Sequence, residues 1–210
     1  MKFDAQEMLA SVYACHRDSS PPVDSSYLAS YPAIIEHFQA IEHFTPNHLI
    51  VGAHLVYGWM PTILELNFSS LDEAVALLEA ARQGIVLTAP QIAQLASTVN
   101  NSVIGASKLL HFTNPNVYPI WDSRVFQFLN RISADPALKG HHYQVNKATL
   151  YEAYARTCRA VALTTDFQPT YHSLLTQFTA LPGYQTFAIT ALRALEYIMF
   201  SGGGQHGSSA

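Results

Sequence analysis

Residues 119–131 read PIWDSRVFQFLNR. A short apolar approach ends in one carboxylate, Asp122, and an amphipathic helix is predicted to begin directly after it. Aspartate is a common N-cap because its side chain accepts hydrogen bonds from the free amides of the first helical turn. A single carboxylate beside bulky apolar residues is also a plausible catalytic position. On residue type alone, both interpretations remain open.

The rest of the chain has a helical pattern almost throughout. Apolar residues recur at three- and four-residue spacing in nine further segments: 4–17, 26–44, 46–59, 71–83, 90–97, 106–112, 146–163, 170–179 and 185–200. Thr45 followed by Pro46 is a typical helix start. The only strand candidate, 84–88, is equally compatible with a turn between helices. The sequence therefore predicts an all-α fold of about ten helices.

Composition indicates a folded protein. Apolar residues make up 49% of the 210 residues and charged residues 12%, which places the chain outside the range of disordered sequences. We expect one compact domain over 1–200, followed by a disordered Gly/Ser-rich tail over 201–210. No apolar run reaches about 18 residues, so the sequence predicts no transmembrane helix. A signal peptide begins with a basic segment followed by an apolar one, whereas this N-terminus carries Asp4 and Glu7, so we expect no signal peptide. We therefore expect a cytoplasmic monomer with no membrane partner, and two reduced thiols at Cys15 and Cys158.

Charge is distributed unevenly along the chain. The net charge is −4, but residues 1–99 hold three basic and ten acidic residues, whereas residues 100–165 hold seven basic and three acidic ones. Such an asymmetry places a basic face on an acidic protein, although chance and solvation of the surface explain it equally well. If the basic part binds nucleic acid, we expect few phosphate contacts and a modest salt dependence.

The segment around Asp122 resembles the catalytic segment of the helix-hairpin-helix DNA glycosylases, the superfamily of endonuclease III and adenine glycosylase. That segment typically reads apolar-Val-Asp-Thr-His-apolar-Phe-Arg-x-x-Asn-Arg. The residues that match it in register are Asp122, Val125, Phe126, Asn130 and Arg131, with Ser123 in place of threonine. Arg124 and Gln127 depart from the pattern. The resemblance is close over 119–131 and looser in the segment before it.

The resemblance implies an all-α fold of two packed lobes, with a base-binding cleft between the lobes and a helix-hairpin-helix just before the catalytic aspartate. In this chain the hairpin falls within 90–112, with 98–105 as the connection. The family's hairpin reads Leu-Pro-Gly-apolar-Gly, and its glycines let backbone amides approach a DNA phosphate. Only Gly105 remains here, and we expect Asn100 and Asn101 to supply the left-handed positions.

The resemblance also implies the chemistry. Asp122 would stabilise the positive charge that develops on the sugar as the N-glycosidic bond breaks. Some family members use a lysine of the second hairpin helix as an amine nucleophile, and Lys108 lies in that helix. Alignment on Gly105 places Ser107 at the nucleophile position instead. Since one residue turns a helix by about 100°, the register decides between Lys108 as a nucleophile and Lys108 as a phosphate contact or a solvated side chain.

Further candidates for DNA or base contacts are His111, Trp121, Arg124 and Arg131. Aromatic side chains here would stack on a base extruded from the duplex, or simply belong to the core. Arg124 and Arg131 lie seven residues apart and share a helix face, where Arg131 contacts phosphate or pairs with Asp135. Two cysteines cannot supply the four-cysteine iron–sulfur site of many relatives, and the histidines of 37–54 lack metal-binding spacing, so we expect no cofactor and no metal.

The sequence thus predicts a DNA glycosylase that acts on double-stranded DNA and removes a damaged or modified base. A bulky modified phage base, with a role in defence, is one candidate beside oxidised and alkylated bases. The alternative is a non-catalytic helical module that binds nucleic acid or protein, in which Asp122 only caps a helix.

Overall fold

The computed structural model describes residues 3–16, 21–22, 25–133 and 142–203. Within them the chain forms ten α-helices: α1 (Ala5–His16), α2 (Ser26–Gln39), α3 (Pro46–Trp59), α4 (Leu71–Arg82), α5 (Ala89–Thr98), α6 (Val103–Thr113), α7 (Ser123–Ile132), α8 (Ala148–Ala162), α9 (Gln168–Thr179) and α10 (Ala191–Gly203). Two 3-10 segments, Phe68–Ser70 and His142–Asn146, join them, and the described residues contain no strand beyond one isolated bridge between Leu66 and Val99. The predicted all-α class is confirmed.

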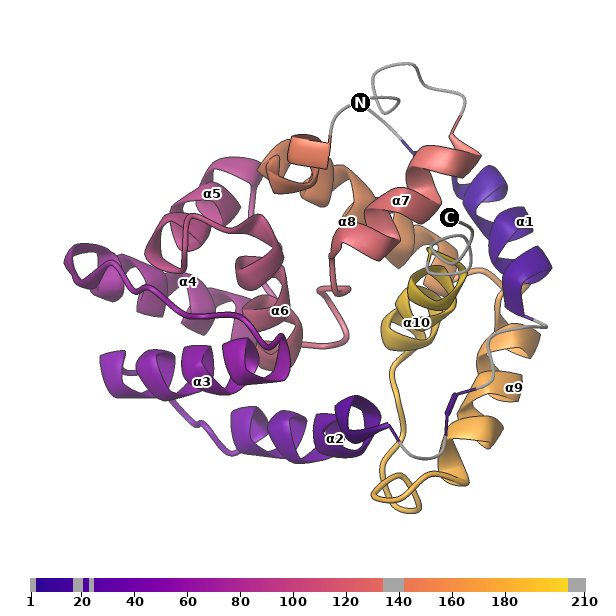
Figure 1. The fold of residues 1–210 in the computed structure, drawn as a ribbon, viewed down its shortest axis with the longest axis horizontal. Coiled ribbons are helices and arrows are strands. Elements are labelled where there is room, and N and C mark those ends of the chain that lie inside the picture. Colours follow the sequence, from indigo (N-terminus) through magenta and orange to yellow (C-terminus); the bar gives the residue numbers. More distant parts are fainter. Residues whose placement is uncertain (1–2, 17–20, 23–24, 134–141, 204–210) are drawn as a thin grey trace, which may run out of the picture.

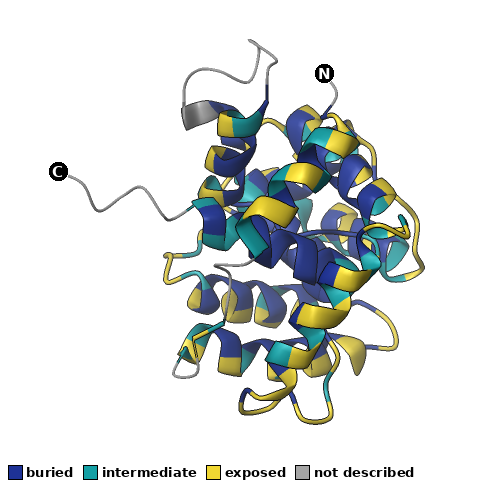
Figure 2. Cartoon of the chain, turned by 90° about the vertical axis from the view of Figure 1, so that its right-hand side faces the viewer, coloured by how far each residue is buried: buried dark blue, intermediate teal, exposed yellow. Residues whose placement is uncertain are grey.

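The helices lie on two sides of the molecule (Figure 1). Helices α2 to α6 are on one side, and α1 lies with α7 to α10 on the other, so the first and last helices pack together. One continuous set of buried apolar side chains runs through both sides, and the faces turned to solvent carry the exposed residues (Figure 2). Because the core is shared, the division into two lobes stays a prediction.

Local signals fix the helix starts. The Thr45 side chain accepts from the His48 amide at 3.3 Å and Pro46 opens α3, as expected. Thr190 caps α10 by accepting from the Arg193 amide at 3.1 Å. The segment 84–88 is a turn and not a strand, since Gly84 has a φ of 86° and its amide returns to the Ala81 carbonyl at 3.0 Å.

Some predicted boundaries are wrong. Helix α2 ends at Gln39, although Ile41 and Phe44 continue its apolar spacing and are buried. Helix α10 begins at Ala191 and continues to Gly203, so Ser201–Gly203 belong to a helix and not to the tail; residues 204–210 lie outside the described part. A Cβ on Gly203 would lie 2.2 Å from the Arg124 carbonyl oxygen, so its glycine permits the close approach of α10 to α7.

Candidate active site

The connection between α5 and α6 is a tight turn braced from both sides. Asn100 and Asn101 have φ values of 55° and 48°, which confirms the two left-handed positions expected of them. The Asn100 side chain accepts from the Glu65 amide at 2.8 Å and donates to the Ile63 carbonyl at 2.9 Å. Asn146 donates to the Asn101 carbonyl at 2.8 Å. The turn is therefore held rigidly at the protein surface.

Gly105 lies in the first turn of α6 and not in the connection, contrary to the prediction. Its amide donates to the Ser102 hydroxyl at 3.1 Å, which caps the helix, so this amide is not directed at a phosphate. A Cβ at this position would meet the Tyr57 hydroxyl at 2.1 Å. Glycine is needed here because α3 packs closely against α6.

We expect Gly105→Ala to lower the free energy of unfolding by about 1–3 kcal/mol, since overpacking forces neighbours to move. Tyr57→Phe in the same chain should recover part of the loss by removing the hydroxyl. Gly58→Ala is the control, because a Cβ there meets nothing within 4 Å and alanine favours the helix. Urea unfolding of the three variants measures the effect; equal behaviour of Gly105→Ala and Gly58→Ala would contradict it.

Ser107 forms hydrogen bonds with the backbone of the segment before Asp122. Its hydroxyl donates to the Ile104 carbonyl at 2.8 Å and lies 3.1 Å from the Trp121 carbonyl and 3.2 Å from the Trp121 amide. Ser107 and Trp121 are both fully buried, and the Trp121 indole donates to the Val145 carbonyl at 2.7 Å. Neither side chain is accessible, so the placement of Ser107 at the nucleophile position and the predicted contact of Trp121 with DNA are both wrong.

His111 is also a core residue. It is fully buried, with Nε2 2.7 Å from the Tyr31 hydroxyl and Nδ1 2.7 Å from the Tyr118 carbonyl oxygen. Burial lowers the pKa of His111 to about 3, with a further lowering from Arg193, so the ring is neutral at physiological pH. The prediction that His111 stacks on an extruded base is wrong for the same reason of access.

Asp122 caps α7, as its position in the sequence suggests. One carboxylate oxygen, Oδ1, accepts from the Arg124 and Val125 amides, each at 2.9 Å. The residue is 7% exposed and its side chain lines a cleft. No hydrogen bond to the second oxygen, Oδ2, is present in the described part of the chain, so Oδ2 can face a ligand.

The cleft has a volume of about 330 Å³. Lys108, Asp122, Ser123 and Arg124 line it together with Tyr57, Met60, Thr62, Asn100, Ser102, Ile104 and Phe200. The cleft is thus formed by the end of α3, the hairpin, the start of α7 and the end of α10. Of the ten residues expected at the site, four line this cleft, namely Asn100, Lys108, Asp122 and Arg124.

Lys108 points into the cleft from α6 but has little contact with solvent. It is 7% exposed, and its Nζ lies 5.6 Å from the centre of the Trp59 ring. Burial lowers the pKa of the amine, and the charges of Asp122 and Glu196 oppose this shift in part. The helix register therefore places Lys108, and not Ser107, at the cleft beside the carboxylate, which corrects the alignment on Gly105.

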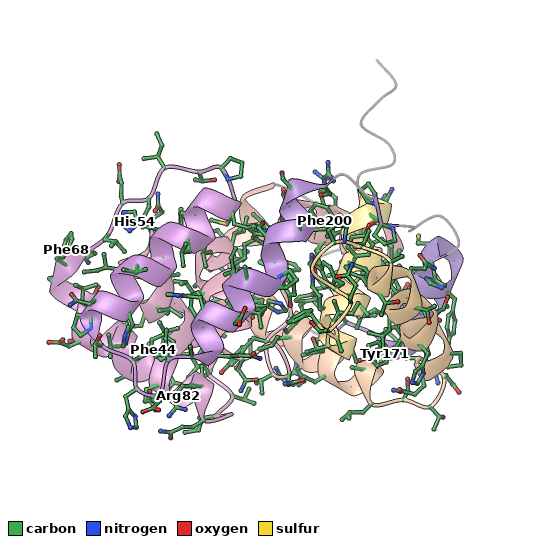
Figure 3. All side chains as sticks on the ribbon, turned by 90° about the horizontal axis from the view of Figure 1, so that it is seen from below. Phe44, His54, Phe68, Arg82, Tyr171 and Phe200 are labelled. Carbon is green, nitrogen blue, oxygen red and sulfur yellow. The ribbon has the colours of Figure 1, made fainter. Side chains whose placement is uncertain are left out.

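Three aromatic side chains stack beside the cleft, and no local pattern in the sequence indicates their stacking. Tyr27 stacks on Trp59 with ring centres 3.9 Å apart, and Phe200 lies 6.0 Å from Tyr27. Figure 3 shows Phe200 where α10 faces the N-terminal helices, away from Phe44 and Arg82. A second hollow of about 530 Å³ lies along Tyr27 and Trp59. Of these three rings only Phe200 lines the cleft, and it offers an apolar face of the kind on which a base stacks.

The two predicted arginine contacts differ in their surroundings. Arg124 is exposed, lines the cleft and lies 4.6 Å above the Phe200 ring. The Arg131 guanidinium donates to the Gly202 carbonyl near the end of α10, where a cation favours the helix dipole. A role for Arg131 in DNA binding stays a prediction, as does that of the exposed Asn101. Asp135, the alternative partner predicted for Arg131, lies outside the described residues.

Other site types find no support among the described residues. Those residues contain no group of three or more His, Cys, Asp or Glu side chains that could hold a metal ion. Cys158 is buried, Cys15 is partly buried, and neither forms a disulfide. None of the described helices is long and apolar enough to cross a lipid bilayer.

Comparison with known proteins adds no assignment: the chain matches no family model, no curated protein and no solved structure.

Proposed function

We propose that this protein is a DNA glycosylase that removes a damaged or modified base from double-stranded DNA. The observation that carries the proposal is the pairing of a helix-capping carboxylate, Asp122, with a desolvated amine, Lys108, in one cleft bordered by aromatic rings. A cleft of about 330 Å³ has the size of a pocket for one small organic ring system.

Each group has a chemical task in this reaction. As the glycosidic bond breaks, positive charge develops on the sugar, and a fixed carboxylate kept from bulk water stabilises that charge. Asp122 meets this requirement, because two backbone amides hold it and solvent barely reaches it. A neutral amine is a nucleophile, and burial moves Lys108 towards that form. Lys108 would then form a covalent bond with the sugar, which adds lyase activity to base release.

The test is incubation of the protein with duplexes that carry oxidised, alkylated and deaminated bases, and with phage DNA that carries bulky modified bases. Released base is measured by mass spectrometry, and abasic sites by strand cleavage with alkali. Base release from at least one substrate is expected. DNA binding without release from any of them would favour a non-catalytic binding module instead.

Arg124 is expected to contact a DNA phosphate beside the cleft. Replacement by Ala should weaken binding to DNA of any sequence and flatten the salt dependence of the binding constant by up to about one unit on a log–log scale. Arg82→Ala is the control, since Arg82 pairs with Glu79 on α4 away from the cleft. Fluorescence anisotropy at several salt concentrations measures both variants. The same salt slope for both would exclude a phosphate contact at Arg124.

A further inference from the structure

Ile63 is one of the two most exposed large apolar side chains in the described part of the chain. It is 85% exposed, and only Leu163, at 86%, is comparable. A single exposed apolar residue is common on protein surfaces and needs no explanation by itself. Ile63 differs from such residues in its position beside the cleft and in the contacts that hold its backbone.

Ile63 lies at the rim of the cleft that holds the candidate active site. Met60 and Thr62, which precede it in the chain, both line this cleft. Asn100 lines the cleft as well, and its side chain donates to the Ile63 carbonyl at 2.9 Å. The exposed isoleucine is therefore one residue away from the cleft wall and is tied to a second residue of that wall.

Hydrogen bonds fix the backbone that follows Ile63. The Asn100 side chain accepts from the Glu65 amide at 2.8 Å, and the Asn100 amide donates to the Glu65 carbonyl at 3.0 Å. The Asn67 amide donates to the Thr98 carbonyl at 3.0 Å. The segment is thus fastened along its length to the turn between α5 and α6, and Ile63 is presented on a rigid backbone.

The side chains of this segment alternate between core and solvent. Leu64 and Leu66 are partly buried and pack against the core, whereas Ile63 and Glu65 are exposed. Successive side chains of an extended chain point to opposite sides. Because the two leucines anchor the segment, Ile63 stays directed away from the core.

The chemistry of the segment favours a contact with bases over a contact with phosphates. Residues 60–70 hold no lysine or arginine and one acid, Glu65, so they offer no cation to the DNA backbone. A base that leaves the duplex breaks its stacking and pairing and leaves a gap behind. Proteins that open a base step commonly insert an apolar side chain into it.

Resting on the function proposed above, we infer that Ile63 inserts into the base stack of duplex DNA and fills the gap that the extruded base leaves. Insertion removes the side chain from water, which stabilises the opened duplex. The entropy cost is small because hydrogen bonds already order the segment. Ile63 is a positioning residue: it does not touch the reacting atoms, but it keeps the base from returning to the stack while Asp122 acts on the sugar.

The experiment uses DNA in which the gap already exists, so it requires neither a known substrate nor turnover. The probes are a duplex with one tetrahydrofuran abasic analogue, the same duplex without a gap, and the single strand. Fluorescence anisotropy gives the dissociation constant for each probe. The wild-type protein should bind the abasic duplex most tightly. Ile63→Ala should lose about 10-fold in affinity for the abasic duplex and keep its affinity for the other two probes.

Two further variants serve as controls. Ile63→Leu should bind the abasic duplex like the wild type, because it keeps an apolar side chain of the same volume. Leu163→Ala removes an almost equally exposed side chain that lines a different hollow, beside Arg159 and Thr190. It should leave all three dissociation constants unchanged. Thermal unfolding should show that every variant is folded, since exposed positions contribute little to stability.

Three results would overturn the inference. The first is an affinity of Ile63→Ala for the abasic duplex equal to that of the wild type. The second is a loss of affinity that is the same for all three probes, which would make Ile63 a general surface contact. The third is a wild-type protein that binds the intact duplex as tightly as the abasic one.

The inference and the proposed function fail in different ways. If Ile63→Ala loses the preference for the abasic duplex while the wild-type protein releases no base, Ile63 fills gaps in DNA and the glycosylase proposal is wrong. If the wild-type protein releases a base, Ile63→Ala should release it from the duplex about 10-fold more slowly. Release by Ile63→Ala at the wild-type rate would leave the glycosylase proposal standing and exclude Ile63 from it.

Discussion

Asp122→Asn should abolish base release while leaving the fold intact. Asparagine keeps the shape of the side chain and still caps a helix, but it carries no charge to oppose the sugar cation. Removal of one preorganised electrostatic group typically slows an enzyme by about 100- to 1,000-fold. Single-turnover release of the base measures the rate, and thermal unfolding should show a melting temperature close to that of the wild type.

Asp4→Asn provides the matched control. Asp4 caps α1 in the same way, since its Oδ1 accepts from the Gln6 and Glu7 amides at 2.8 and 2.9 Å, but it is exposed and lines no part of the cleft. Its replacement should leave base release unchanged. Equal activity of the two variants would reduce Asp122 to a helix cap, and unfolding of Asp122→Asn alone would favour a structural role for the carboxylate.

The sequence predicted helices best where their signals are local. The bounds of α3 and the start of α7 agree with the prediction, because Thr45 with Pro46 and Asp122 mark these starts within one turn. Helix α10 was misplaced at both ends, since the apolar residues before Ala191 pack without being helical and the glycines after Phe200 pack within a helix. Apolar spacing records burial, and burial is not confined to helices.

The candidate site was only partly predictable for a related reason. Asp122 and Lys108 lie fourteen residues apart, on a hairpin helix and the helix start that follows it, so a sequence motif can pair them. Trp59, Tyr27 and Phe200 come from three distant helices, and their stacking is a tertiary contact without a local signal. Arg193 and Glu196 do stand out in the sequence, as two charged residues within the otherwise apolar stretch ALRALEYIMF. Only the fold shows that they lie near Asp122.

The second large effect is expected at Lys108, because the register of α6 places this side chain at the cleft. If the amine attacks the sugar, Lys108→Ala should lose the borohydride-trapped adduct with DNA completely, because no other amine lines the cleft among the described residues. Adduct formation is measured by denaturing electrophoresis of labelled DNA. Base release should fall as well, by about 100-fold or more if water cannot replace the amine.

Ser107→Ala is the neighbouring control and should lower stability without affecting adduct formation. Its hydroxyl is buried between the backbone of Ile104 and that of Trp121, so its removal should cost about 1–3 kcal/mol of folding free energy. The folded fraction should still form the adduct at the wild-type rate, because the side chain does not face the cleft. An adduct that survives in Lys108→Ala would place the nucleophile elsewhere, and base release without any adduct in the wild type would make water the nucleophile, with Asp122 as the group that orients it.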